Sequence, residues 1–65
     1  MTREFYQSTL DFVRDKATAL GISRMLLYWN LDGVISCAVR DDEMHIDDFD
    51  FLVAYKDTIM EDYEK

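Results

Sequence analysis

The sequence predicts a small α+β domain in which an antiparallel β-hairpin packs against two helices, in the order α-β-β-α. Two segments, 3–20 and 47–63, carry apolar residues at the three- and four-residue spacing of amphipathic helices. Between them lies a run rich in branched and aromatic side chains around an Asp-Gly pair, a pattern typical of a hairpin. A chain of 65 residues corresponds to a single domain, taken here as residues 1–65.

The first helix is predicted over residues 3–20. Its apolar stripe consists of Tyr6, Leu10, Val13, Ala17 and Leu20. Thr2 is suited to cap the start of this helix, because its hydroxyl accepts a hydrogen bond from a backbone N–H of the first turn. Gly21 is suited to the left-handed position after the last turn, which a side chain would strain.

The hairpin is predicted over 24–30 and 34–40. A two-residue Asp-Gly turn would pair Leu31 with Val34, whereas a longer turn with a glycine bulge pairs Trp29 with Ile35. The second register is favoured because it gathers one apolar face, made of Met25, Leu27, Trp29, Ile35, Cys37 and Val39. The outer face and the hairpin edge then stay available for dimerisation or partner binding, through Leu26, Tyr28, Val34 and Ala38.

Residues 41–46 are predicted to form an acidic linker that leads into a second helix over residues 47–63. Asp47 is the expected N-cap of this helix, and Ile46 and Phe51 are expected to form a hydrophobic staple around it. Lys56 falls inside the apolar stripe, where its stem packs while its amine reaches water.

The negative charge is concentrated at the C-terminal end of the chain. Residues 41–65 hold ten carboxylates and two lysines, a net charge of −8, whereas residues 1–40 hold five bases and four acids, a net charge of +1. The resulting charge of −7 argues against direct binding of nucleic acid or of anionic membranes, since phosphate binding rests on Lys and Arg.

Other features set the expected compartment and exclude further function classes. No segment approaches the ~20 apolar residues of a membrane span. The single cysteine allows no disulfide within the chain, and the N-terminus lacks the pattern of a secretory signal, so a cytoplasmic location is expected. Glycine-rich phosphate loops are absent, and we expect no enzyme and no cofactor.

Two candidate reactive groups have simpler structural interpretations. His45 with Asp47 and Asp48 offers metal-ligand types, but three neighbouring loop residues leave a site incomplete, so a solvated histidine beside a helix cap is expected. Cys37 would need a nearby base to act as a nucleophile, and its place on the apolar strand face predicts a buried, inert thiol. No catalytic or metal-binding residue is therefore predicted.

Residues 46–53 resemble the end of an EF-hand loop that runs into its exit helix. In that alignment the first ligand position falls on Val39, the glycine position on Met44 and the closing glutamate position on Asp50. Val39 has no oxygen ligand in its side chain, so calcium binding is not expected.

The aromatic residues of the hairpin have different expected roles. Trp29, Tyr28 and Tyr6 could form a stacking platform for nucleic acid, but few bases lie beside them. Trp29 is instead expected in the core, because it lies on the apolar face. Tyr28 lies on the mixed face and is a candidate anchor for an interface.

The acidic half of the chain has two interpretations. It is a solvated surface that keeps a small protein soluble, or it is an electrostatic ligand for a basic protein surface. The predicted partner-binding residues are Asp41, Asp42, Glu43, Asp47, Asp48, Asp50, Asp57 and Glu61.

The leading functional hypothesis is a non-enzymatic binding module that docks on a basic, nucleic-acid-handling protein, as an inhibitor or a nucleic-acid mimic. In size and charge the chain resembles the small inhibitors that phages and mobile elements encode. The alternative is a homodimer or assembly subunit that uses the outer face of the hairpin, with the acids serving solubility only.

Overall fold

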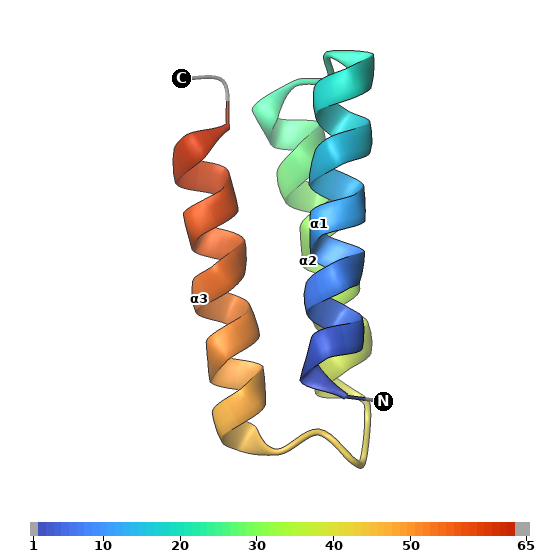
Figure 1. Ribbon diagram of the computed structural model, residues 1–65, viewed down its shortest axis with the longest axis vertical. Coiled ribbons are helices and arrows are strands. Elements are labelled where there is room, and N and C mark those ends of the chain that lie inside the picture. Colours follow the sequence, from blue (N-terminus) through green and yellow to red (C-terminus); the bar gives the residue numbers. More distant parts are fainter. Residues whose placement is uncertain (1, 64–65) are drawn as a thin grey trace.

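Three helices form the structure, a computed structural model of which residues 2–63 are described here. They are α1 (Arg3–Leu20), α2 (Arg24–Val39) and α3 (Ile46–Asp62). The chain runs up, down and up, so that α1 and α3 point the same way and α2 runs against both (Figure 1). The bundle is elongated, with principal dimensions of 34 × 17 × 17 Å.

Helix α1 spans the residues predicted for it, and its two ends are capped as expected. The Thr2 hydroxyl accepts a hydrogen bond from the Phe5 amide at 3.3 Å. Gly21 adopts φ +68°, the left-handed conformation that favours glycine, and the Ile22 amide donates back to the Ala17 carbonyl at 3.2 Å. The chain therefore reverses tightly between α1 and α2.

The predicted hairpin is wrong, because residues 24–39 form the single helix α2 and residues 2–63 contain no strand. Ser23 caps this helix with its hydroxyl, which accepts from the Leu26 amide at 3.3 Å. The Asp32-Gly33 pair makes no turn and lies in the middle of the helix. The fold is accordingly a three-helix bundle and not an α+β domain.

Residues 24–39 form a helix because their apolar residues also repeat with the period of a helix. The buried residues of α2 are spaced four, four and three apart: Leu27, Leu31, Ile35 and Ala38. This spacing places them on one side of a helix, where they pack against α1 and α3. Met25, Leu27 and Trp29 alternate as on one face of a strand, but they differ in burial. Leu27 is fully buried, whereas Met25 and Trp29 are 67% and 68% exposed.

Helix α3 begins one residue before the predicted start, and its cap differs from the prediction. His45 is the N-cap, and its Nδ1 accepts a hydrogen bond from the Asp47 amide at 3.1 Å. Asp47 thus lies in the first turn, where its negative charge interacts favourably with the positive end of the helix dipole. Met44 and Phe49, and not Ile46 and Phe51, pack against the core at this end.

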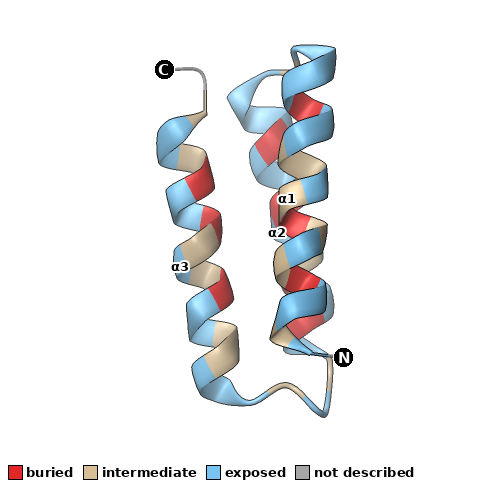
Figure 2. Ribbon diagram, viewed as in Figure 1, coloured by how far each residue is buried: buried red, intermediate tan, exposed pale blue. Residues whose placement is uncertain are grey.

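The core runs along the bundle axis, and the buried residues of each helix lie on the part of its ribbon that is turned toward the other helices (Figure 2). Four leucines are fully buried and fill its centre: Leu10, Leu27, Leu31 and Leu52. Each contributes about 1.5–3 kcal/mol by leaving water. Among the described residues, none of the helices is long and apolar enough to cross a membrane.

Candidate functional site

Helix α3 presents a regular acidic stripe on the side turned away from the other helices. Asp47, Asp50, Asp57 and Glu61 are all exposed and follow one another at helical intervals. At 3.6 residues per turn they fall within an arc of about 80°. The buried residues Leu52, Lys56 and Ile59 occupy the opposite side of the helix. We call these four carboxylates the acidic face.

Ala54 lies in the middle of the acidic face. It is one turn from Asp50 and from Asp57, and two turns from Asp47 and Glu61. Its methyl group is exposed and leaves space between the longer acidic side chains.

The acidic face is not neutralised by the bases of residues 2–63. Within residues 2–63, no Lys or Arg forms an ion pair with Asp47, Asp50, Asp57 or Glu61. The imidazole of His45 lies 3.7 Å from the Asp47 carboxylate, where it also caps the helix. Lys56 is the only base of α3, and it is turned into the bundle with 7% of its surface exposed. The negative field of this face is therefore directed outward.

Two of the eight predicted acidic residues serve the fold. The Asp48 carboxylate lies 3.7 Å from the Arg3 guanidinium of α1. Asp41 accepts hydrogen bonds from the Tyr6 hydroxyl at 2.8 Å and from the Glu43 amide at 3.0 Å. Asp42 and Glu43 are exposed on the loop between α2 and α3, away from the stripe of α3.

Tyrosine hydroxyl groups fix α3 against the rest of the bundle. The Tyr55 hydroxyl donates to the Asp11 carboxylate of α1 at 2.6 Å. The Tyr63 hydroxyl lies 2.7 Å from the Ile22 carbonyl oxygen and 3.0 Å from that of Ala17. The Arg24 guanidinium of α2 donates to the Met60 carbonyl oxygen at 2.6 Å. The acidic face thus belongs to an ordered helix held at several points.

The residues predicted for the outer face of the hairpin do not form one surface. Leu26 is 51% exposed, but Val34 is half-buried and Ala38 is completely buried in the core. Tyr28 is 44% exposed, and its ring is covered on one side by the Lys56 ammonium group, 4.5 Å from the ring centre. A helix distributes these positions around its axis, whereas the predicted strand would have placed them together.

Two further predictions fail for the same reason. Trp29, expected in the core, is 68% exposed, and Cys37, expected to be buried, is also exposed. Both residues lie outside the stripe of buried residues of α2, which consists of Leu27, Leu31, Ile35 and Ala38. The helical spacing of the apolar residues in 24–39 is the signal that would have predicted the exposure of Trp29 and Cys37.

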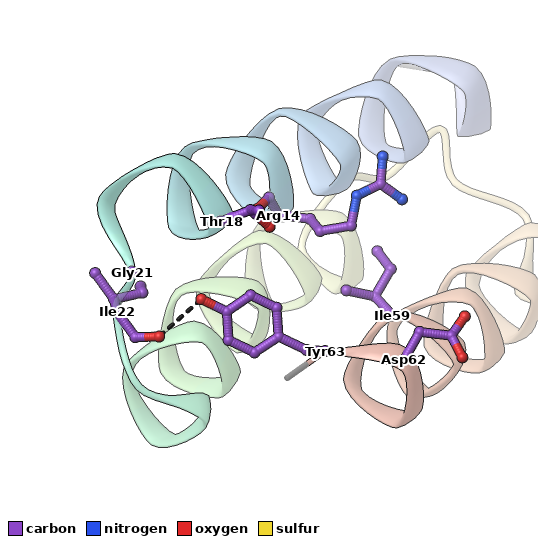
Figure 3. A pocket seen from close by; sticks show the side chains of 7 residues that line it. All are labelled: Arg14, Thr18, Gly21, Ile22, Ile59, Asp62 and Tyr63. Atoms are coloured by element: carbon purple, nitrogen blue, oxygen red, sulfur yellow. Dashed lines mark hydrogen bonds between the residues drawn. The ribbon is translucent and has the colours of Figure 1, made fainter. Parts of the chain in front are cut away.

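A hollow of about 350 Å³ opens between the C-terminal ends of α1 and α3. Figure 3 shows the ring of Tyr63 across it, with the hydroxyl directed at the Ile22 carbonyl oxygen. Arg14 and Asp62 line its sides. The Thr18 hydroxyl at its edge donates to the Arg14 carbonyl oxygen at 3.0 Å, so its proton is engaged within α1.

Metal-ligand types do not converge in the described part of the chain. No group of three or more His, Cys, Asp or Glu side chains within residues 2–63 is placed to hold a metal ion. The nearest candidates by sequence, His45, Asp47 and Asp48, lie at the start of α3. There the His45 Nδ1 accepts from the backbone and Asp48 faces Arg3.

Comparison with known proteins gave no match to a family model, to a curated protein or to a solved structure.

Proposed function

We propose that the protein is a non-enzymatic interaction module that docks on a basic surface of another protein through the acidic face of α3. The observation that carries this proposal is the stripe of Asp47, Asp50, Asp57 and Glu61, exposed and unpaired with any Lys or Arg of residues 2–63. A nucleic-acid-handling protein is the natural class of partner, because such proteins carry basic patches.

The charge of the whole chain supports this proposal through association kinetics. A net charge of −7 on 65 residues gives a strong negative potential, and such a field accelerates encounter with a basic partner. The tyrosine hydrogen bonds hold the acidic face in place before binding, so little ordering cost opposes association.

The spacing of the carboxylates indicates the kind of basic surface that fits. The acidic face extends over about 21 Å of helix, with neighbouring acids about 4.5–10.5 Å apart along the helix axis. A nucleic-acid strand carries one phosphate per about 3.4 Å of axis. The face therefore suits separate Lys and Arg side chains on a protein better than it copies a continuous phosphate backbone.

We further place the protein in the cytoplasm. Its one thiol, Cys37, is exposed and forms no disulfide, which suits a reducing compartment. Thiol reactivity of protein released from cells without reductant tests this placement, since an oxidising compartment would leave the thiol blocked.

Substitution of Ala54 by Lys tests the use of the acidic face. The new ammonium group would occupy the centre of the stripe and pair with Asp50 and Asp57, which adds a few tenths of a kcal/mol to helix stability. The matched control is Ala19→Lys, since Ala19 is also exposed, lies on α1 and follows Asp15 by one turn. Both variants change the net charge equally.

The immobilised protein and both variants are used to capture proteins from a cell lysate at low and at physiological salt. The proposal requires basic proteins that bind the wild type and Ala19→Lys, that are lost with Ala54→Lys, and whose association slows as salt is raised. Equal capture by all three chains, or an association rate that does not change with salt, would show that the acids act only in solubility.

A further inference from the structure

A second surface, on the side of the bundle away from α3, carries several exposed large apolar side chains. Between α1 and α2 lies a groove of about 380 Å³, lined mainly by carbon atoms, with Phe12 and Leu20 on one wall and Leu26 on the other. These three side chains are 63%, 73% and 51% exposed. We call this surface the α1–α2 face.

Helix α2 carries very few charged side chains. Between its first residue, Arg24, and its last, Val39, the only Asp, Glu, Lys or Arg is Asp32, which lies 3.8 Å from the Lys56 ammonium group of α3. Helices α1 and α3 cover one side of α2, and the side that carries Met25 and Trp29 is left open.

The exposed apolar area is in the range of a weak, reversible dimer. At ~200 Å² for a whole aromatic side chain, Phe5, Phe12 and Trp29 at 48%, 63% and 68% exposure leave about 360 Å² open. Leu20 and Leu26 are each more than half exposed and together add roughly half that amount. The total, on the order of 550 Å², matches weak interfaces, which bury less than about 600 Å² per partner.

We propose that the α1–α2 face binds a second copy of this chain, with the two α2 helices antiparallel and crossing at Gly33. The other residues of this side of α2 are placed symmetrically about Gly33. Asn30 and Ser36 lie three residues to either side of it, Trp29 and Cys37 four residues, and Leu26 and Arg40 seven residues.

In an antiparallel two-fold pair, each residue of one helix faces the residue equally far on the other side of the crossing point. In the antiparallel pair, Trp29 of one copy lies over the small Cys37 of the other, and Asn30 faces the hydroxyl group of Ser36. Gly33 sits at the crossing, where a Cβ atom would meet nothing within 4 Å in the isolated chain. The open space at Gly33 lets the two backbones approach closely.

The charge distribution selects this face for contact between copies of an acidic chain. Lys16 is the only charged side chain in the lining of the groove. The acidic face belongs to α3, on the far side of the bundle, so pairing through α1 and α2 keeps the two sets of carboxylates apart. Contact through α3 would instead bring like charges together.

A disulfide trap tests the geometry directly. In the background Cys37→Ser, the variant Gly33→Cys places its thiol at the proposed two-fold axis, where two Cα atoms lie within the range that a disulfide spans. We expect rapid, nearly complete oxidation to a covalent dimer. The control Ala54→Cys in the same background should oxidise slowly, because its thiol lies on α3.

Sedimentation of the wild-type chain over a range of concentrations supplies the second measurement. We expect a reversible dimer, and we expect the emission of Trp29 to move to shorter wavelength as the dimer forms. Gly33→Glu should raise the dimer dissociation constant at least about a hundredfold, since it sets two carboxylates against each other. Retained helicity by circular dichroism shows that the variant still folds.

Either of two outcomes overturns the proposal. One is a chain that stays monomeric into the high micromolar range with unshifted Trp29 emission. The other is a dimer in which Gly33→Cys and Ala54→Cys oxidise at the same rate, which would place the contact elsewhere.

Discussion

The ammonium nitrogen of Lys56 lies 4.5 Å from the centre of the Tyr28 ring, and it reaches this position from inside the bundle. The same nitrogen is 3.8 Å from the Asp32 carboxylate, whose side chain is 56% exposed. Lys56 thus crosses the apolar interface between α2 and α3 with its stem and ends at the surface between a ring and an acid. This contact removes Tyr28 from the role of a free interface anchor.

We predict that Lys56→Met leaves the free energy of unfolding unchanged or raises it by up to about 1 kcal/mol. Methionine fills the same volume, and no charge then has to be held at a site that is 7% exposed. Urea denaturation measures the change, with Lys16→Met on the α1 surface as the control. A loss of about 3 kcal/mol would instead show that the ion pair with Asp32 is a main support of the bundle.

Removal of the Tyr63 hydroxyl should weaken the attachment of the end of α3. Tyr63→Phe keeps the ring but loses the hydrogen bond to the turn after α1, at a cost of about 1 kcal/mol. Amide hydrogen exchange should rise in residues 59–63 and around Ile22, whereas exchange in the middle of α2 should follow global stability only. Unchanged exchange at both places would contradict the role we assign to this hydroxyl.

The same substitution should have opposite effects at the two glycines. Gly21→Ala forces alanine into φ +68° and should cost about 1–2 kcal/mol. Gly33→Ala lies in the middle of α2, meets no atom within 4 Å, and should stabilise the helix by about 0.5–1 kcal/mol. Thermal unfolding at low concentration, where the chain is monomeric, measures the change in stability for each variant. Changes in the same direction would contradict the roles that we assign to the two glycines.

Stability should fall in alkaline solution because of Tyr6. The hydrogen bond that its hydroxyl donates to Asp41 raises the pKa of Tyr6 above its ordinary value of 10.0. Because the pKa of Tyr6 is higher in the folded chain than in the unfolded chain, its protonated hydroxyl contributes fully to stability below pH 10. This contribution to stability is lost as the pH rises through the pKa of Tyr6 in the folded chain. Unfolding curves measured across this range should show the decline.

The matched variant for this prediction is Tyr6→Phe, which has no phenol to titrate at this position. It should be less stable at neutral pH, and the difference from wild type should shrink as the pH rises above 10.0. A difference that stays constant with pH would exclude a contribution from the Tyr6–Asp41 hydrogen bond.

The two outer helices could be predicted because their signals are local. The Thr2 cap, the apolar stripe from Tyr6 and the left-handed Gly21 all lie within a few residues of the features that they control. The position of Asp50, Asp57 and Glu61 on one side of α3 likewise follows from their spacing alone. Asp41 and Asp48 differ because their partners, Tyr6 and Arg3, are far away in the sequence.

Helix α2 could not be assigned with the same certainty because two periods compete in it. Met25, Leu27 and Trp29 alternate as in a strand, while Leu27, Leu31 and Ala38 repeat as in a helix. The Asp-Gly pair and the branched residues Val34 and Ile35 favoured a hairpin locally. Packing against α1 and α3 decided the outcome, since most helical stability in proteins comes from tertiary contact.

The arrangement of the two surfaces has a consequence for stoichiometry. The acidic face and the α1–α2 face lie on opposite sides of one narrow bundle, 17 Å across. A pair of chains joined at Gly33 therefore turns its two acidic stripes in opposite directions, and both cannot rest on one flat target. Such a pair would gain no avidity on a single partner and would act as a linker that holds two basic molecules together.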